Sequence, residues 1–310
     1  GLFTALGRDH AGIVWQHDLE VAADTAHAVA LLGGPPMPQP LRHAQHKGSF
    51  GNLVVIGGAP GMLGAARLAA RAALGAGAGR VYLCPLDDAA PLADLMQPEL
   101  MLRRRVWDDD RSLLQDATIV CGCGGGSAVR ELLPVLLEAA PRLLLDADAL
   151  NAIAADAALG QRLAARAARG AATVLTPHPL EAARLLEASV AAVQADRLRH
   201  AGALAARFAC TVVLKGSGSI IASPAEWPTI NPSGNALLAS AGTGDVLAGW
   251  IGGLWASGAA VGDKPAAAAA AAARDGVFLH GLAADVALAA GLSHPLLASS
   301  LIDLLRTLPR

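Results

Sequence analysis

The sequence Ala239-Ser-Ala-Gly-Thr-Gly-Asp-Val-Leu-Ala-Gly249 carries the strongest chemical signal in this chain. It places a glycine-rich turn and one carboxylate, Asp245, at the start of an apolar helical pattern. Such a turn points several backbone N–H groups at an anion. A carboxylate beside it can take a proton from a hydroxyl that attacks phosphorus. The pattern therefore predicts phosphoryl transfer from a nucleotide to an alcohol; the alternative is a tight turn in which Asp245 only caps a helix.

Two further polar turns favour the first interpretation. Lys215-Gly-Ser-Gly-Ser219 follows the strand-like run 211–214, and Asn231-Pro-Ser-Gly-Asn235 comes after the short apolar run 220–222. Residues of these types form the turns that bound β-strands. These two turns, which bound short β runs, predict the walls of a nucleotide pocket.

The bulk composition argues against several classes of protein. Of the 310 residues, 54% are hydrophobic, 16% charged and 3% aromatic, and the formal net charge is −2. This balance gives no electrostatic reason to expect binding to nucleic acid or to an anionic membrane. The mean hydropathy of +0.43 comes mostly from alanine. The longest apolar run, 265–273, is far shorter than the roughly 20 residues that span a bilayer.

The cysteines and the start of the chain indicate the compartment. The four cysteines stand at or near the ends of β-like runs, and Cys121-x-Cys123 does not match a paired zinc knuckle. Buried thiols in a reducing environment are therefore expected. The N-terminus lacks the basic and then apolar segments of a signal peptide. We therefore expect a cytoplasmic protein.

Strand-like and helix-like segments alternate along the chain, which predicts an α/β fold with a mainly parallel sheet and helices on both faces. In such sheets ligands bind at the carboxyl ends of the strands, so turns that follow strands share one rim. The predicted strands are 53–56, 80–84, 117–121, 142–145, 172–175, 211–214 and 219–222. The predicted helices are 62–76, 128–139, 150–155, 161–168, 179–187, 190–208, 245–255, 264–289 and 297–308.

The first part of the chain differs in composition. Gly33-Gly-Pro-Pro36, with Pro38 and Pro40, is typical of a linker. We therefore divide the chain into an N-terminal segment with a Pro-rich linker, residues 1–45, and a catalytic domain, residues 46–310. Because segments with few core contacts tolerate truncation, removal of residues 1–40 is expected to leave activity and solubility largely unchanged. The alternative is that the apolar run 29–32 packs as a helix against the domain or a neighbouring subunit.

Other polar or glycine-rich stretches also follow predicted strands. The turn 57–66 and Cys121-Gly-Cys-Gly-Gly-Gly-Ser127 are expected either to approach a ligand with their backbone or only to pack closely. The first of them is neither a Walker A loop nor a Gly-x-Gly-x-x-Gly fingerprint. Asp146 stands where it could act on Mg²⁺ or water, and Ser127 and Asp148 are interpreted as helix N-caps. His178 stands at the same rim and is either a ligand contact or structural.

These motifs together resemble the ADP/ATP-dependent NAD(P)H-hydrate dehydratase family, which is related to the ribokinase-like kinases. The resemblance covers about residues 46–306. Cys123 stands where the family usually has proline, Ala241 where it usually has glycine, and Ser219 where threonine is common. The matching motifs are Lys47-Gly-Ser-Phe-Gly51, Gly64-Ala-Ala66, Asp146-Ala-Asp-Ala-Leu150, Thr176-Pro-His178, Leu214-Lys-Gly216, Asn231-Pro-Ser-Gly-Asn235 and Gly242-Thr-Gly-Asp-Val-Leu247.

The N-terminal stretch has a resemblance of its own. Gly1-Leu-Phe-Thr-Ala5, Gly12-Ile-Val14 and Asp18-Leu19 are similar to the tail of the NAD(P)H-hydrate epimerase domain, which is often fused ahead of the dehydratase. This likeness implies that the chain is the C-terminal piece of a bifunctional protein. An epimerase domain, fused or separate, is therefore an expected partner.

The resemblance implies a three-layer α/β/α ribokinase-like fold and an enzyme that dehydrates the hydrated nicotinamide ring of NADH or NADPH. ADP or ATP would phosphorylate the ring hydroxyl, Mg²⁺ is expected with the nucleotide, and loss of phosphate would restore the ring. A homo-oligomer is also expected. One alternative is a ribokinase-like kinase of a small alcohol such as a vitamin precursor, against which Thr176-Pro-His178 and Lys47-Gly-Ser-Phe-Gly51 argue. Another is a nucleotide-binding module without turnover, against which the intact Asp245 argues.

The resemblance also assigns the site residues. Asp245 would be the catalytic base, and the backbone N–H groups of residues 241–244 would stabilise the transferring phosphoryl group. Asp146 and Asn151 are expected behind the site or beside Mg²⁺, and no residue is expected to bind a metal directly. The substrate would contact Ala65, Gly124 (with Gly126 as the alternative), His178 and Asp245. The nucleotide would contact Lys215, Gly216, Ser217, Gly218, Ser219, Gly242, Thr243 and Gly244.

Overall fold

A ten-stranded sheet forms the centre of the computed structural model, which describes residues 2–15, 17, 26–37, 42–91, 93–258 and 264–309. The strand order is β1-β10-β9-β8-β7-β6-β5-β2-β3-β4. Adjacent strands run parallel except where β9 pairs with β8 and with β10. This confirms the predicted mainly parallel sheet. The strands are β1 (Leu31–Leu32), β2 (Asn52–Gly57), β3 (Arg80–Pro85), β4 (Met101–Leu102), β5 (Thr118–Cys121), β6 (Arg142–Leu145), β7 (Ala172–Leu175), β8 (Thr211–Leu214), β9 (Ile220–Ala222) and β10 (Thr229–Ile230).

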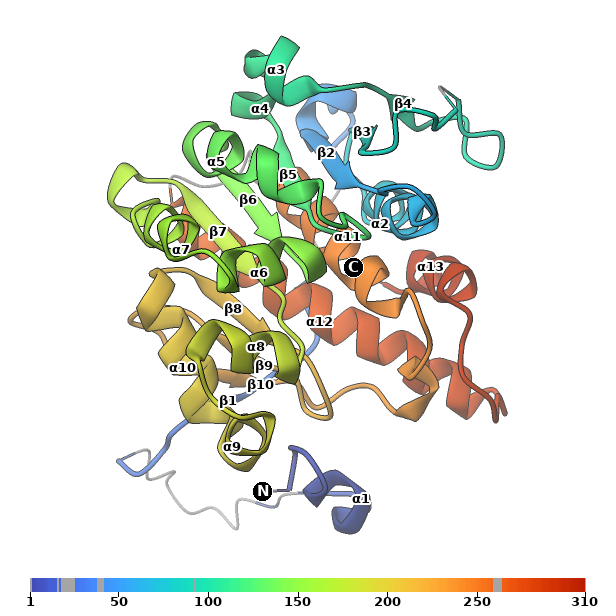
Figure 1. Ribbon diagram of the computed structural model, residues 1–310. Helices are drawn as coiled ribbons and strands as arrows, with labels where there is room; N and C mark the ends of the chain where they lie inside the picture. The colour runs from blue at the N-terminus through green and yellow to red at the C-terminus, as the bar shows by residue number, and fades with distance from the viewer. Residues whose placement is uncertain are drawn as a thin grey trace.

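Helices cover both faces of the sheet and make the three layers (Figure 1). Because side chains alternate along a strand, Val54 and Ile56 pack in one core with helices α5–α10, whereas Leu53 and Val55 pack in a second core with α2, α11 and α12. A third cluster attaches α13 to α2, α11 and α12. The helices are α1 (Gly7–Ala11), α2 (Leu63–Gly75), α3 (Val106–Asp109), α4 (Arg111–Asp116), α5 (Val129–Ala139), α6 (Ala147–Ala154), α7 (Ala157–Ala164), α8 (Pro179–Leu186), α9 (Val190–Ala195), α10 (Arg197–Phe208), α11 (Thr243–Gly258), α12 (Pro265–Ala289) and α13 (Ala298–Thr307).

Small residues let α11 pack against α2 at close range. A Cβ placed on Gly249 would lie 1.9 Å from the carbonyl oxygen of Ala69, and one on Gly253 would lie 2.5 Å from that of Ala73. No larger side chain fits at these positions without moving a helix. The alanine- and glycine-rich composition therefore fixes the axis of the helix that carries Asp245.

The structure corrects three local predictions. The helix predicted at 190–208 is interrupted at Asp196, whose carboxylate accepts from the backbone N–H of Arg199 and so begins α10. Asp148 lies inside α6 and is not its N-cap. The predicted cap Ser127 precedes the N-cap position of α5, which Ala128 occupies.

The N-terminal region contributes to the sheet. Leu31 and Leu32 form the edge strand β1, which pairs with β10, and the N–H of Gly33 donates to the carbonyl oxygen of Ile230 at 2.8 Å. The apolar run 29–32 therefore packs on the domain, but through the strand β1 and not as the helix that was the alternative to a linker. Pro38, Pro40 and the stretch Asp18-Leu19 lie outside the described residues, so the boundary at residue 45 stays a prediction.

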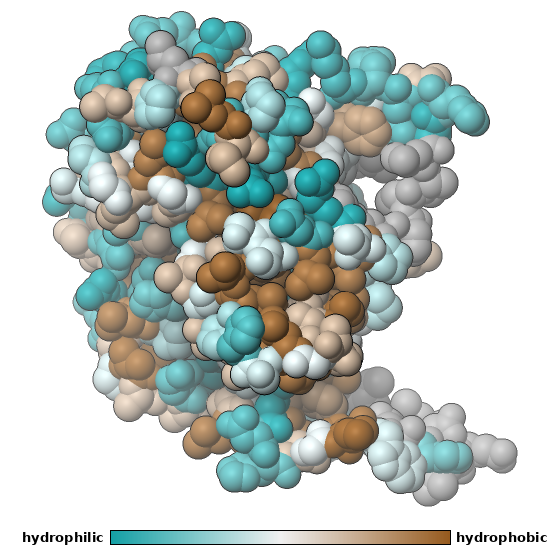
Figure 2. Space-filling model, turned by 90° about the vertical axis from the view of Figure 1, so that its right-hand side faces the viewer, coloured by the Kyte–Doolittle hydropathy of each residue, from teal (hydrophilic) through white to brown (hydrophobic). Residues whose placement is uncertain are grey.

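The surface and the thiols agree with the composition. Among the described residues, no helix combines the length and apolarity needed to cross a bilayer. The side of the molecule that carries α13 shows several groups of apolar side chains (Figure 2). Leu297, the N-cap residue of α13, is 67% exposed, and Leu288 on α12 is 52% exposed. All four cysteines are buried, unpaired thiols.

Candidate active site

The site lies at one rim of the sheet, where four adjacent strands end. Asp146 follows β6, Thr176 follows β7 and Lys215 follows β8, while the glycine-rich stretch that contains Cys123 follows β5. Neighbouring parallel strands end at the same edge, so these side chains meet. The prediction that the turns share one rim is confirmed.

A buried ion pair occupies the middle of this rim. Nζ of Lys215 lies 2.7 Å from Oδ1 of Asp146, which also accepts a 2.8 Å hydrogen bond from the hydroxyl of Thr176. Asp146 is 1% exposed. Although burial alone lowers the pKa of Lys215, the carboxylates of Asp146 and Glu181 raise it above its usual value. Lys215 is therefore a fixed positive charge at the rim.

Asp245 enters the same rim from the first turn of α11. One carboxylate oxygen of Asp245, one of Asp146 and the sulfur of Cys123 all lie within 4.8 Å of one another. Burial, followed by the nearby charge of Asp146, raises the pKa of Asp245 to about 6. A hydrogen bond with the Cys123 thiol and the charge of Lys215 act in the opposite direction. A carboxylate with this pKa is ionised at neutral pH and is a competent proton acceptor.

The turn that precedes α11 is held for anion binding. Gly242 has a φ of +88°, and the Thr243 hydroxyl donates to the carbonyl oxygens of Leu238 and Ser240, each at 2.9 Å. Nε2 of the buried His280 lies 2.9 Å from the carbonyl oxygen of Thr243. The first backbone N–H groups of any α-helix lack an intrahelical acceptor. Those of α11 are held in place by these contacts and can therefore bind an anion.

Lys215 borders this turn. A Cβ placed on Gly244 would lie 3.6 Å from Nζ of Lys215. The helix N-terminus and the ammonium group are therefore within reach of the same anion. The structure thus brings together Lys215, Gly244 and Asp245 as the sequence predicts.

The glycine-rich stretch after β5 contacts the start of α2. A Cβ on Gly124 would lie 3.0 Å from Cβ of Ala65, whereas one on Gly126 would meet Ala59. The N–H of Gly126 donates to a carboxylate oxygen of Asp148 at 2.8 Å. The two predicted substrate residues Ala65 and Gly124 are therefore neighbours, and Asp148 braces the loop beside them.

His178 is both a rim residue and the N-cap of α8. Its Nδ1 accepts from the N–H groups of Leu180 and Glu181, at 3.1 and 3.3 Å, so Nε2 carries the proton. Nε2 lies 3.2 Å from a carboxylate oxygen of Glu181, and the side chain is 46% exposed. Burial and the charge of Lys215 lower the pKa of His178. The exposed part of a neutral imidazole remains available to a ligand.

Asn151 has a partner outside the ion pair. Its amide oxygen accepts a 2.6 Å hydrogen bond from the guanidinium of Arg184 on α8. Its expected place beside Mg²⁺ therefore gains no support from this contact and stays a prediction.

Three contributors were not singled out from the sequence as site groups. His280 is a lone histidine in an alanine-rich helix, a pattern typical of a core histidine. Arg197 donates to the carbonyl oxygens of Leu214 and Lys215 at 3.1 and 3.3 Å. Arg8 lies more than 200 residues from the groups that it contacts. The only signal in the sequence is that each of these polar side chains stands in an apolar helix pattern or in the N-terminal segment.

The residues present fit a magnesium–nucleotide. The α11 N-terminus and Lys215 suit phosphate oxygens. The two carboxylates of the cluster suit a hard cation, which prefers oxygen ligands. Burial and the charges of Asp146 and Asp245 raise the pKa of the Cys123 thiol well above its usual value, so the thiol stays protonated and is no ligand for such an ion.

Comparison with known proteins gives a consistent result. A family model described as NAD(P)H-hydrate dehydratase matches residues 53–307. The chain is 44% identical over 267 residues to the ADP-dependent (S)-NAD(P)H-hydrate dehydratase of Neisseria meningitidis, covering 85% of this chain and 86% of the relative. It is 38% identical over 278 residues to the bifunctional NAD(P)H-hydrate repair enzyme of Coxiella burnetii, covering 88% of this chain and 53% of the relative. The chain thus spans about half the length of that bifunctional relative.

Solved structures agree on the fold. The ADP/ATP-dependent NAD(P)H-hydrate dehydratase of Bacillus subtilis, co-crystallised with ATP and Mg²⁺, superposes with a TM-score of 0.70 at 28% identity. The match covers 87% of this chain and 92% of the other. A hydroxyethylthiazole kinase of Pyrococcus horikoshii shares the fold, with a TM-score of 0.55 at 19% identity over 84% of this chain and 89% of the other.

Proposed function

Because the chain belongs to the NAD(P)H-hydrate dehydratase family, we propose that it converts hydrated NADH or NADPH back to the dihydronicotinamide, using ADP or ATP. The observation that carries this proposal is the convergence of Asp245, Lys215 and the α11 N-terminus on one rim. A base, a fixed positive charge and a set of backbone donors are the groups that phosphoryl transfer to a hydroxyl requires.

In the first step, the Asp245 carboxylate takes the proton of the ring hydroxyl as that oxygen attacks the terminal phosphorus. The P–O bond to the nucleotide breaks, and the nucleotide leaves one phosphate shorter. Lys215 and the N–H groups of residues 242–244 stabilise the charge on the transferring group. A bound Mg²⁺ would neutralise further phosphate charge. Asp146 is the carboxylate of the cluster that would hold it, because Asp245 acts as the base.

In the second step, phosphate replaces hydroxide as the leaving group. The hydroxyl-bearing carbon is next to the ring nitrogen, so the nitrogen lone pair expels phosphate as the C–O bond breaks. Loss of a proton from the neighbouring carbon restores the dihydronicotinamide. The oxygen of the lost water leaves in the phosphate, so the atoms balance for either nucleotide.

The substrate side of the site is formed by Ala65, Gly124 and His178. Gly124 packs closely on Ala65 and on Met62, so no larger side chain fits at position 124. We assign the hydrated ring and its ribose to Ala65, Gly124 and the exposed part of His178. The nucleotide lies along residues 215–219 and 242–244.

The test is a direct assay. The protein is incubated with hydrated NADH or NADPH, Mg²⁺ and either ADP or ATP, and absorbance at the dihydronicotinamide band is followed with phosphate release. The proposal expects a rise in absorbance that needs nucleotide and equals the phosphate released. Formation of a stable phosphoester from a small alcohol, with no repair of the hydrate, would instead establish the kinase alternative.

Three further assignments belong to this proposal. We propose a homo-oligomer, for which exposed apolar side chains such as Leu288 on α12 and Leu297 at the start of α13 offer contacts. Light scattering after size exclusion measures the mass. We also propose a reducing, cytoplasmic location, which the four buried free thiols support.

An epimerase, fused or separate, would supply the reactive epimer, in keeping with the bifunctional name of the Coxiella relative.

A further inference from the structure

The N-terminal residues 3–8 lie across the turn 215–219, although more than 200 residues separate them in sequence. The N–H of Ala5 donates to the carbonyl oxygen of Ser217 at 3.0 Å, and the hydroxyl of Ser217 donates to the carbonyl oxygen of Ala5 at 3.2 Å. A Cβ placed on Gly218 would lie 1.9 Å from the carbonyl oxygen of Phe3. The segment therefore packs backbone against backbone on the turn, and glycine at 218 permits it.

Arg8 extends the contact to a second turn. Its guanidinium donates to three successive carbonyl oxygens, those of Pro232, Ser233 and Gly234, at 2.8, 3.3 and 2.7 Å. Charge-assisted hydrogen bonds of this kind are stronger than neutral ones. Residues 3–8 therefore connect the two polar turns at 215–219 and 231–235; we call this segment the N-terminal strap.

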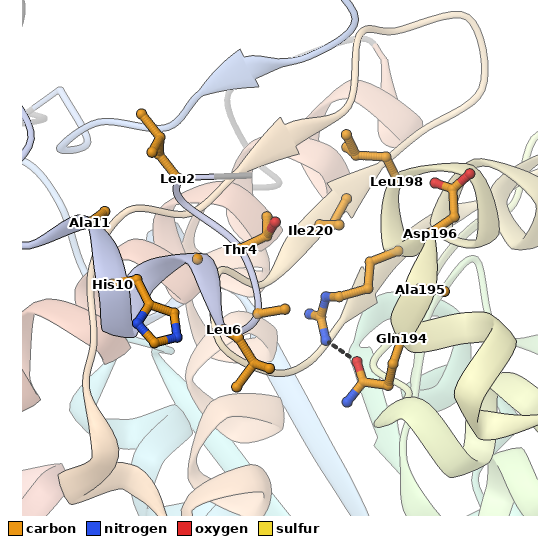
Figure 3. A pocket seen from close by; sticks show the side chains of 13 residues that line it. Leu2, Thr4, Leu6, His10, Ala11, Gln194, Ala195, Asp196, Leu198 and Ile220 are labelled. Atoms are coloured by element: carbon orange, nitrogen blue, oxygen red, sulfur yellow. Dashed lines mark hydrogen bonds between the residues drawn. The ribbon is translucent and has the colours of Figure 1, made fainter.

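Arg197 supports the turn 215–219 from the side opposite the strap. It lines a cavity of about 850 Å³ that lies between the strap and the junction of α9 and α10 (Figure 3). Leu6 lines one wall and Ile220 another. Arg197, also in the lining, holds the carbonyl oxygens of Leu214 and Lys215. The turn is thus fixed between Arg197 and the strap.

Fixing this turn has a consequence for a ligand. Gly216 and Gly218 have positive φ, at 143° and 62°, and glycine turns lose much conformational freedom when they bind. A turn that is already fixed loses less on binding and so binds more tightly. Lys215, whose ammonium group faces the α11 N-terminus, begins this turn.

We propose that the N-terminal strap preorganises the nucleotide side of the site, with Arg8 as a positioning residue for ADP or ATP. The inference rests on the proposed function, because it takes residues 215–219 as the nucleotide contact. Arg8 does not touch the reacting atoms. It acts on nucleotide affinity by holding the turn 231–235 and, through the strap, the turn 215–219.

The test compares Arg8→Ala and Arg8→Lys with wild type and with Arg162→Ala, an exposed arginine on α7, as the matched control. Nucleotide affinity is measured by calorimetry with ADP and ATP, and hydrogen exchange is followed at residues 215–219 and 231–235. Arg8→Ala is expected to weaken nucleotide binding by about tenfold, the scale of one or two lost net hydrogen bonds. The KM for the hydrated dinucleotide at saturating nucleotide and kcat should change less than about twofold. Arg8→Lys should recover part of the affinity.

The outcomes separate this inference from the proposed function. If wild-type protein binds neither nucleotide, both are overturned. If wild type binds and turns over, but Arg8→Ala binds as tightly as wild type and Arg162→Ala, only the strap inference is overturned. Tighter binding in Arg8→Ala would also overturn it, because the segment would then compete with the nucleotide. Circular dichroism of each variant confirms that a lost affinity does not reflect lost folding.

Discussion

The ammonium group of Lys215 lies 2.7 Å from the carboxylate of Asp146, and the two side chains are only 18% and 2% exposed. A buried charge that loses its partner is costly, whereas replacing both partners costs much less. Lys215→Met should therefore lower the free energy of unfolding by about 3 kcal/mol at pH 7, because Asp146 keeps only the Thr176 hydroxyl as a close partner. Urea denaturation measures the loss.

The double variant Lys215→Met/Asp146→Asn is the control for this stability effect. Its loss should be smaller than the sum of the two single losses, by more than about 1 kcal/mol. Additive losses would show that the two charges contribute independently and that the pair is not the unit that holds the rim.

The position of Asp245 predicts a catalytic loss without a binding loss. Asp245→Asn should lower kcat about 10²–10⁴-fold, the range for a removed general base. The nucleotide Kd should stay within a few-fold of wild type, because the backbone N–H groups and Lys215 remain. Asp303→Asn, which changes an exposed carboxylate on α13, controls for the change of charge. Near-normal turnover in Asp245→Asn would contradict the phosphoryl-transfer assignment.

The pKa of Asp245 predicts how the rate depends on pH. Burial raises this pKa to about 6, and the base works only when it is ionised. We therefore expect kcat/KM for the hydrated dinucleotide, which reports the pKa of the free enzyme, to be constant above about pH 7 and to fall about tenfold per unit well below pH 6. A pH profile at hydrated dinucleotide concentrations well below KM measures this. A profile that stays flat to pH 5 would mean that another group is the base.

The same group affects stability with a defined sign. A carboxyl pKa that is raised on folding adds stability below its unfolded value, near 4, and that stability is lost as the pH rises through about 6. Asp245→Asn should therefore be more stable than wild type above pH 6 by about 1–2 kcal/mol, a value discounted for partial exposure. The two proteins should converge at pH 4, which thermal unfolding at both pH values can check.

His178 requires a pair of variants because it has two structural roles. His178→Ala removes both the cap of α8 and the imidazole, and a lost N-cap costs about 1 kcal/mol. His178→Asn can still cap the helix but has no imidazole. We expect both variants to raise the KM for the hydrated dinucleotide by about tenfold and that for the nucleotide much less, while only the alanine variant loses stability.

A purely structural histidine would give a different pattern. His178→Asn would then keep normal kinetics, and His178→Ala would lose stability only. Ser189→Ala, which removes the N-cap of α9, shows how a lost cap by itself affects the kinetics.

The parts of the fold that local chemistry controls could be predicted from the sequence. Strands β2, β5, β6, β7 and β8 are mostly apolar, as expected for strands that helices cover on both faces. Asp245, Lys215 and Asp146 each follow glycine turns or strand ends, and parallel strands bring such positions to one rim. The edge strand β1 has only two residues, and its partner β10 lies far away in the chain. Strand β10 is equally short, with two residues. No local pattern specifies them.

The unpredicted contacts depend on geometry that sequence spacing does not encode. Asp148 was interpreted as a helix cap because it precedes an apolar run, but α6 begins earlier in the chain. The carboxylate of Asp148 instead accepts a hydrogen bond from the N–H of Gly126. Asp196 interrupts a pattern that reads as one helix, because its side chain offers the backbone a competing hydrogen bond. Arg8 meets its carbonyl partners only after the whole domain has folded.

The edge strand β1 changes what truncation is expected to do. The composition alone predicts that removal of residues 1–40 is harmless. In the structure, however, the N–H of Leu31 donates to the carbonyl oxygen of Pro228 and that of Gly33 to Ile230, each at 2.8 Å, so β1 covers the edge of β10. An uncovered strand edge pairs readily with another chain.

A protein that lacks residues 1–36 should therefore melt a few degrees lower than one that lacks residues 1–28, and should self-associate more. Both proteins lack the strap, so their difference isolates β1. Thermal unfolding and size-exclusion chromatography at several concentrations measure it. Equal melting temperatures and elution volumes would mean that residues 29–36 act as a linker after all.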